Sequence, residues 1–366
     1  MSGVQAFGQR VKGGEAIADL DLRSIALTPG DYAGAVLVRC DLRGMTMDGQ
    51  DWTDSRFYDC LMDGTDWRGA VLDECAFNGC ELNRTLWCQS AIKNSSWTMC
   101  SAQEADFTGA ALSDCHFTRC VLTRARFGET RLSAGSFSEC GLDELELIGA
   151  ALERTLIYSG DLSRAALRGM SWEAVVAVEL AMAGQDLRGL RLRRCQLTDS
   201  RMEGCDLGAA DLEQTSFKGA SLREARLSGA RAGRAMFVKA DMHQAQCQGG
   251  LFPQSLWADA FVEGADFSGA DLSQAIFHRA RCRGAVFSHA ALSYADFSYA
   301  DLRAADLREG RFMRTQLHRA VTLDARWTSR AGILENDPHL YEAELWSAAR
   351  PTAGRAGPGA ASVDRI

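Results

Sequence analysis

The chain has 366 residues, of which 46% are hydrophobic and 24% charged, and its formal net charge is -8. This composition is typical of a folded, soluble protein, and five prolines against 35 glycines exclude a collagen-like or largely disordered chain. The most apolar stretch, 174–183, is interrupted by Glu179 and is too short to span a bilayer, so no membrane segment is expected.

The thirteen cysteines indicate the compartment. The N-terminal sequence has no continuous apolar segment of the kind that a secretory signal requires. Without such a signal, this many cysteines favour a reducing environment in which thiols stay free. We therefore expect a cytoplasmic location, in a bacterium.

A five-residue period runs from Leu22 to Trp327 without a slip. Large apolar residues fill most of its positions, and of 16 Phe and 8 Trp all but Phe7, Phe261 and Trp346 fall in this phase. A second phase, two residues earlier, holds small residues, as in the alanines that recur every five residues over 265–305. The repeat therefore reads small, polar, bulky, polar, polar.

This period fits neither a helix nor a continuous strand. Five residues turn an α-helix by about 500°, which would spread the bulky residues over every side. In a strand an odd step would send them alternately to the two faces. A short extended step followed by a corner buries both phases, and repetition of that unit predicts a solenoid.

A longer period of twenty gives the number of sides. One series of cysteines and one series of aromatic residues recur at this interval: Cys40, Cys60, Cys80, Cys100, Cys120 and Cys140, and Phe57, Phe77, Trp97, Phe117 and Phe137. Twenty residues per turn means four pentads and four faces. At a rise of ~4.8 Å per coil, about 15 coils predict a rod ~75 Å long.

Segments such as 265–274 (ADFSGADLSQ) and 294–303 (YADFSYADLR) resemble the pentapeptide-repeat family over about residues 20–328. The resemblance implies an all-β solenoid, a right-handed quadrilateral β-helix, with no general catalytic activity. Fold and function are separate inferences, since one fold carries many functions.

The ends and the middle of the chain break the pattern. We expect an N-terminal lead-in over 1–19, the β-helix over 20–328, a capping helix within 329–349 and a disordered tail over 350–366. Apolar residues of the helix are expected to cover the open end of the coil: Leu340, Tyr341, Leu345 and Trp346. The weaker repeats of 170–190 are interpreted as a distorted coil or a short helix, and as a candidate hinge.

No residue set predicts a catalytic, cofactor or metal site. The cysteine ladder lacks the close C-x₂-C pairs of zinc sites and is interpreted as packing. The histidines form no ligand pair and are expected to be solvated or satisfied: His116, His243, His278, His289, His318 and His339. Aspartates that recur at the corners are expected to bind nearby backbone amides or water: Asp266, Asp271, Asp296, Asp301 and Asp306.

Two arginine clusters are interpreted as parts of a mixed-charge surface rather than as a nucleic-acid site: Arg188, Arg191, Arg193 and Arg194, and Arg279, Arg281 and Arg283. Residues 22–170 hold 14 basic and 21 acidic side chains, whereas residues 171–327 hold 20 and 19. The first half is therefore acidic and the second nearly neutral.

Two functions of different classes remain. The first is a non-enzymatic protein–protein interaction scaffold or adaptor, because a rod with flat faces offers long strips for docking. The C-terminal pattern Asp337-Pro338…Ala343-Glu344…Trp346 is similar to that of pentapeptide-repeat proteins associated with bacterial type VI secretion.

The alternative is a DNA mimic that binds DNA gyrase or another topoisomerase and protects it from inhibitors, as some relatives of this fold do. The acidic first half fits this function and the neutral second half does not. Neither a direct nucleic-acid partner nor a membrane is expected, and homodimer formation is left open.

Overall fold

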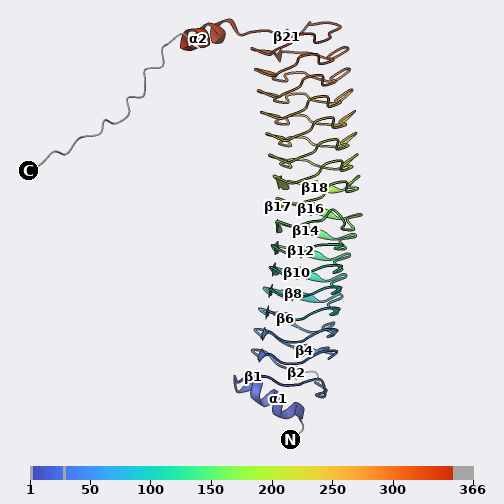
Figure 1. The fold of residues 1–366 in the computed structure, drawn as a ribbon, viewed down its shortest axis with the longest axis vertical. Helices are drawn as coiled ribbons and strands as arrows, with labels where there is room; N and C mark the ends of the chain where they lie inside the picture. The colour runs from blue at the N-terminus through green and yellow to red at the C-terminus, as the bar shows by residue number, and fades with distance from the viewer. Residues whose placement is uncertain (1–2, 28–29, 349–366) are drawn as a thin grey trace, which may run out of the picture.

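A computed structural model describes residues 3–27 and 30–348 as a right-handed β-solenoid of about 16 turns (Figure 1). Each strand pairs in parallel with the strand of the next coil at a register of twenty residues, as in Phe57↔Phe77 and Phe77↔Trp97. The prediction of four pentads per turn is confirmed.

Short strands line two of the four sides. A 10-stranded sheet holds β1 (Ala16–Ala18), β3 (Val36–Val38), β5 (Arg56–Tyr58), β7 (Ala76–Asn78), β9 (Ser96–Thr98), β11 (His116–Thr118), β13 (Ser136–Ser138), β15 (Leu156–Tyr158), β17 (Val176–Val178) and β19 (Gln196–Thr198). A 7-stranded sheet holds β6 (Leu72–Asp73), β8 (Ala91–Lys93), β10 (Ala111–Ser113), β12 (Arg131–Ser133), β14 (Ala151–Glu153), β16 (Ser171–Glu173) and β18 (Arg191–Arg193). Two further pairs are β2 (Gly30–Asp31) with β4 (Gln50–Asp51), and β20 (Thr315–Gln316) with β21 (Ile333–Leu334).

We number the faces by the column of bulky residues behind each. Face 1 lies over the column that begins at Leu22, face 2 over that of Leu27, face 3 over that of Tyr32 and face 4 over that of Leu37. The 7-stranded sheet belongs to face 3 and the 10-stranded sheet to face 4. Between about residue 201 and β20, successive coils are joined by isolated parallel bridges instead of strands, and the register of twenty continues, as in Leu256↔Ile276.

Most corners share a residue with a positive φ, but their hydrogen bonds differ. After the strands of the two larger sheets, as at Cys80, the amide that follows the corner makes no bond to the preceding bulky residue; at most other corners that amide donates to the carbonyl of the preceding bulky residue, as from Ala70 N to Trp67 O at 3.2 Å. The residue before that amide has a positive φ, which glycine supplies at Gly69 (φ 75°) and a non-glycine residue at Glu74 (φ 56°). Glycine is therefore favoured at this position without being required there.

Stacked aromatic rings fill the core of the first half. Phe77, Trp97 and Phe117 stack with ring centroids 5.5 and 4.5 Å apart, and each is at most 1% exposed. Rings of the neighbouring column meet them edge-on, as Trp87 meets Trp97 at an interplanar angle of 88°. Such offset and edge-to-face contacts add to the energy of burial.

Buried tryptophans differ in their polar contacts. The indole N–H of Trp67, Trp87 and Trp257 donates to a hydroxyl two residues earlier, at 2.8, 2.8 and 2.7 Å respectively. Trp97 also follows a serine by two residues, but the Ser95 hydroxyl is held by Lys93 O and the Cys75 amide. The Trp97 N–H is consequently buried without a hydrogen-bond partner in the described part of the chain.

The weak repeats of 170–190 form a regular coil and not a helix. β16 and β17 lie in it, in register with both neighbouring coils. Large residues in the small phase, Val175 and Leu180, are accommodated because the bulky position between them holds Ala177. Larger residues in the small phase thus compensate for the smaller residue in the bulky phase, and the core stays filled. The alternative prediction of a short helix at 170–190 is wrong.

The N-terminal lead-in contains α1 (Gly3–Lys12), which the sequence analysis did not predict, and β1, the first strand of face 4. α1 lies at the N-terminal end of the solenoid, next to β1 (Figure 1). Phe7 and Val11 of α1 are each 4% exposed, and the Phe7 ring lies 5.7 Å from that of Tyr32. This helix therefore covers the apolar end of the solenoid.

The C-terminal helix α2 (Pro338–Ala348) does not form the expected apolar cap. It buries none of its residues, and Leu340, Leu345 and Trp346 are about half exposed or more, at 48, 48 and 62%. It lies to one side of the last coils (Figure 1), held by polar contacts. The apolar-stripe prediction is wrong, and the tail expected over 350–366 lies outside the described residues.

Because Trp87 and Trp97 differ mainly in the partner of the indole N–H, they form a matched pair. We expect Trp87→Phe to lower the free energy of unfolding by about 1 kcal/mol more than Trp97→Phe, since only the first loses a hydrogen bond. Denaturant unfolding followed by circular dichroism measures both. Equal losses would contradict this account of the core.

Candidate functional site

The cysteines that recur every twenty residues from Cys40 to Cys140 are buried and hydrogen-bonded in this fold, which disfavours reactivity. Cys40 donates to Ile17 O at 3.4 Å, Cys120 donates to Trp97 O at 3.2 Å, and each is buried. All thirteen cysteines are free thiols, and only Cys88 is partly exposed. Burial raises the pKa of Cys75 and Cys115 to about 12, so these thiols stay protonated at neutral pH.

The corner aspartates bind the backbone, as predicted. Each accepts a hydrogen bond from the amide two residues later, at 2.8 to 3.2 Å: Asp266, Asp271, Asp296, Asp301 and Asp306. Where that later residue is arginine, as in Asp301 and Arg303, the two side chains also form an ion pair. The recurrent aspartates therefore stabilise the backbone at the corners, and arginine neutralises the charge of some of them.

Two histidines are satisfied by protein contacts, one of the two expected states. His243 lies between carboxylates, 2.6 Å from Asp241 and 3.2 Å from Glu263. His318 is only 5% exposed, although its phase points outward, because the segment that leads to α2 crosses it. In the described residues no three or more His, Cys, Asp or Glu side chains are grouped so as to hold a metal ion.

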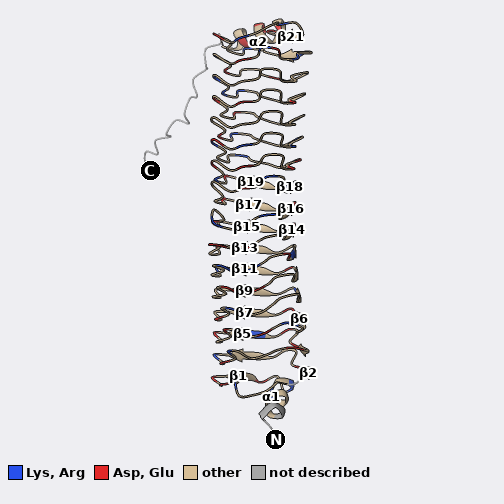
Figure 2. Cartoon of the chain, turned by 90° about the vertical axis from the view of Figure 1, so that its right-hand side faces the viewer, with Lys and Arg blue, Asp and Glu red and all other residues tan. Residues whose placement is uncertain are grey.

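The arginine clusters belong to a mixed-charge surface. Arg188, Arg193 and Arg194 pair with Asp186, Glu213 and Glu173 at 2.6, 2.5 and 2.5 Å respectively. In the second cluster, Arg279 pairs with Asp259 at 2.7 Å, and Arg281 lies over the ring of Phe261 at 4.8 Å. Acidic and basic residues both occur along the whole rod (Figure 2).

No face of the described coils carries acids alone from end to end. The most acidic part is face 3 between residues 31 and 114, with Asp31, Asp51, Asp54, Asp73, Glu74 and Asp114 against Lys93. Farther along the same face come Arg131 and then three arginines of the first cluster. The acidic surface is therefore confined to the first coils.

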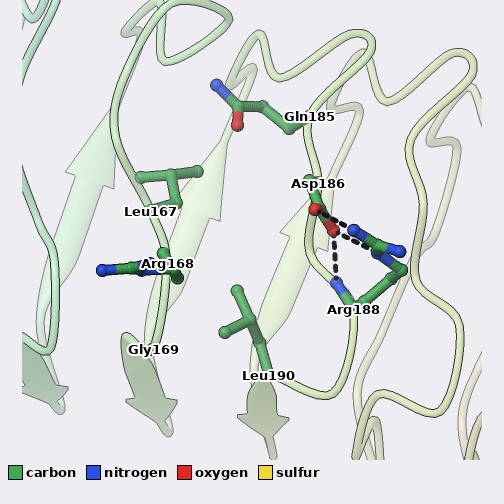
Figure 3. A pocket seen from close by; sticks show the side chains of 7 residues that line it. All are labelled: Leu167, Arg168, Gly169, Gln185, Asp186, Arg188 and Leu190. Atoms are coloured by element: carbon green, nitrogen blue, oxygen red, sulfur yellow. Dashed lines mark hydrogen bonds and ion pairs between the residues drawn. The ribbon is translucent and has the colours of Figure 1, made fainter.

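One hollow opens on face 2, at the coil where the repeats weaken (Figure 3). It measures about 480 Å³ and is lined by Leu167, Arg168, Gly169, Gln185, Asp186, Arg188 and Leu190. Most of its polar groups are already engaged: Arg188 binds Asp186, and the Gln185 amide donates to Leu162 O and Ala165 O at 2.6 and 3.0 Å. These contacts make it part of the coil rather than a ligand site.

Face 4 carries the main exposed apolar surface of the rod. We call the apolar side chains larger than alanine that stand directly before or after a buried bulky-phase residue of this face the apolar strip: Val36, Val38, Tyr58, Leu156, Tyr158, Val176, Val178, Met236, Val238, Leu256 and Ile276. They stand on parallel strands and bridges at the same two outward positions of the coil, in three groups over 36–58, 156–178 and 236–276, and the coils between these groups carry mainly polar residues there. Several are about 40% exposed, such as Leu156 (38%), Tyr158 (40%) and Ile276 (41%). This surface was not predicted, although the phase of the repeat shows from the sequence that these residues point outward.

The charges of face 4 balance. Its outward positions hold equal numbers of basic and acidic residues: Arg39, Arg56, Arg119, Lys218, Lys239, Arg279 and Arg319 against Asp19, Asp59, Glu139, Glu179, Asp199, Asp259 and Asp296. Several pair between adjacent coils, as Arg39 with Asp19 at 2.7 Å and Arg119 with Glu139 at 2.8 Å. The strip thus lies on a neutral face.

Comparison with known proteins identifies the repeat. The pentapeptide-repeat model matches in eight copies, within residues 53–86, 103–138, 182–214, 215–246 and 265–298. The repeats of these segments are pentapeptide repeats, as the sequence pattern predicted. No curated protein matches the sequence significantly. Among the described residues, no helix is both long and apolar enough to cross a membrane.

Three solved structures illustrate the likeness. HetL of the cyanobacterium Nostoc sp. strain PCC 7120, involved in regulating heterocyst differentiation, is 24% identical and covers 66% of this chain and 91% of its own, with a TM-score of 0.28. A trypsin-treated form of QnrB1, a plasmid-mediated fluoroquinolone resistance protein, is 18% identical and covers 60% and 94%, with a TM-score of 0.26. A pentapeptide-repeat protein of the Arabidopsis thaliana thylakoid lumen is 28% identical and covers 32% and 71%, with a TM-score of 0.14. Scores this low carry no argument about function.

The burial of the thiols can be tested by their reactivity. We expect a thiol reagent at pH 8 to modify Cys88 first in the folded protein, because the other cysteines are buried. All thirteen should react in guanidinium chloride. Mass spectrometry of peptides after brief labelling measures the order, and rapid modification of Cys75 or Cys115 would contradict the assigned packing.

Proposed function

We propose that this protein is a non-enzymatic scaffold that binds another protein through the apolar strip of face 4. The observation that carries the proposal is the strip itself, a series of exposed aliphatic and aromatic side chains on a regular, neutral sheet. Within each of its groups, adjacent outward apolar side chains form a patch of the kind that marks interaction sites on soluble proteins. A partner with its own apolar face would gain from covering the strip.

A nucleic-acid ligand fits this face less well. Binding to phosphates depends on clustered lysine and arginine. On face 4 the basic residues are matched by acids and partly paired with them, as Arg279 is with Asp259. A protein partner is therefore the better match to the chemistry of the strip.

The gyrase-binding DNA mimic is the weaker alternative. Mimicry of duplex DNA requires negative charge along one side of the rod. The acids of face 3 are followed by Arg131 and the first arginine cluster, and many corner acids bind arginine, as Asp66 binds Arg68 at 2.6 Å. The charge pattern favours the scaffold over the mimic.

Two narrower assignments rest on sequence alone. An accessory role in bacterial type VI secretion is supported only by the long uninterrupted coil, its central tryptophans and the pattern Asp337-Pro338…Ala343-Glu344…Trp346. A cytoplasmic location is a prediction that follows from the abundance of free thiols. Both belong to the scaffold proposal as hypotheses about where the partner is found.

The scaffold can be tested with charge substitutions in matched positions. We expect Leu156→Glu combined with Ile276→Glu to abolish capture of the partner from native cells, because each places a charge in the apolar strip. The matched control is Val71→Glu combined with Val121→Glu, since Val71 and Val121 are exposed to a similar degree on faces 3 and 1. Affinity capture with quantitative mass spectrometry measures both, after circular dichroism has shown equal folding. Retention of every bound protein by the strip variant would overturn the proposal.

A supercoiling assay separates the two functions. We expect the protein at micromolar concentration to leave gyrase activity, and its inhibition by a fluoroquinolone, unchanged, because no face of the described coils is acidic throughout. Inhibition of supercoiling or protection from the drug would favour the mimic.

A further inference from the structure

Three side chains at the C-terminal end of face 4 converge on one carboxylate. Glu344 of α2 accepts from the Tyr299 hydroxyl, lies 3.4 Å from His318 Nε2, and pairs with Arg319 Nη1 at 2.8 Å. The hydrogen bond from Tyr299, with those from His318 and Arg319, lowers the pKa of Glu344, so the group is a carboxylate at neutral pH. The three donors come from adjacent coils of the solenoid, whereas the acceptor comes from outside it.

The donors are positioned independently of Glu344. The Asp337 amide donates to His318 Nδ1 at 3.2 Å, so the proton of the neutral imidazole is on Nε2, which faces the carboxylate. The Tyr299 ring meets His278 and His318 edge-on, with centroids 5.2 and 5.5 Å apart. The coil backbone and these ring contacts would hold the three groups if the carboxylate left.

The helix that supplies the carboxylate has few other contacts with the solenoid. α2 has no buried residue, and Leu340 and Leu345 are each 48% exposed. Besides Glu344, Tyr341 contacts the rod, under the guanidinium of Arg319 at 5.1 Å. Asn336 and Asp337 attach the segment before α2 to the same coil, by hydrogen bonds with the Arg319 amide and His318 Nδ1 at 2.7 and 3.2 Å. With that segment held, the carboxylate of Glu344 can be exchanged for an equivalent one.

We propose that Tyr299, His318 and Arg319 form a carboxylate-binding site at the end of face 4, filled in cis by Glu344 and available to an acidic side chain of a partner protein. One guanidinium and two neutral donors match a singly charged carboxylate, whereas a phosphate dianion would leave charge uncompensated. The site lies on the same face as the apolar strip. That its ligand comes from a partner protein therefore rests on the proposed function, whereas the existence of the site does not.

The site can be tested with the full-length chain and a peptide of residues 335–348. In Glu344→Ala the peptide should bind in trans, and the same peptide with glutamine in place of Glu344 should bind at least tenfold more weakly. The unmodified chain should bind the peptide at least tenfold more weakly than Glu344→Ala, because its own carboxylate competes. Isothermal titration calorimetry measures these affinities, and N-acetylglutamate as a second ligand distinguishes a free carboxylate from one on a protein segment.

Matched arginine variants locate the binding. In the Glu344→Ala background, Arg319→Met should abolish peptide binding, whereas Arg279→Met, two coils away on the same face, should preserve it. Hydrogen exchange gives a second readout, since Glu344→Gln should expose the α2 amides in the otherwise intact chain. No peptide binding, equal binding of the glutamate and glutamine peptides, or unchanged α2 exchange would overturn the site. N-acetylglutamate binding as tightly as the peptide would overturn the assignment to a protein partner.

The outcome separates the two proposals. A chain that binds the peptide but captures no partner through the apolar strip would leave this site standing and remove the proposed scaffold. Capture of a partner through the strip without peptide binding would do the reverse.

Discussion

The structure depends on the parallel hydrogen bonds between successive coils. The amide of a bulky residue donates to a carbonyl nineteen residues later, as from Trp67 to Leu86 at 2.8 Å, and that of the residue before it to one twenty-one residues earlier, as from Asp66 to Met45 at 2.8 Å. These bonds satisfy the backbone only when each coil closes after twenty residues. Identical positions then stack, which places aromatic rings over one another inside and like side chains in rows outside.

Periodicity was sufficient to predict this architecture, because each coil contacts mainly its neighbours and repeats their pattern. The stack of Phe77, Trp97 and Phe117 followed directly from spacing. α1 was missed, although Phe7 and Val11 lie four residues apart, as on one side of a helix, and Gly14 follows with a positive φ. A single pair of apolar residues at helical spacing was too weak a signal to predict a helix.

The site at the C-terminal end could not be predicted from the repeat. Glu344 contacts Tyr299 and His318, which precede it by 45 and 26 residues, and neither separation is a multiple of the twenty-residue coil. The apolar composition of 340–346 favoured a cap, whereas its actual attachment is polar. The apolar strip was partly predictable. The phase of the repeat placed its residues on the outside of the rod, but only the structure gave their exposure and the neutrality of the face.

The closing of each coil after twenty residues constrains how the chain can change in length. A duplication of twenty residues adds one coil and leaves every later side chain on its original face. An insertion of five residues is equally compatible with the backbone but turns all that follows by a quarter revolution about the rod axis. The apolar residues before and after it would then lie on adjacent sides, so a partner spanning them would tolerate indels only in whole coils.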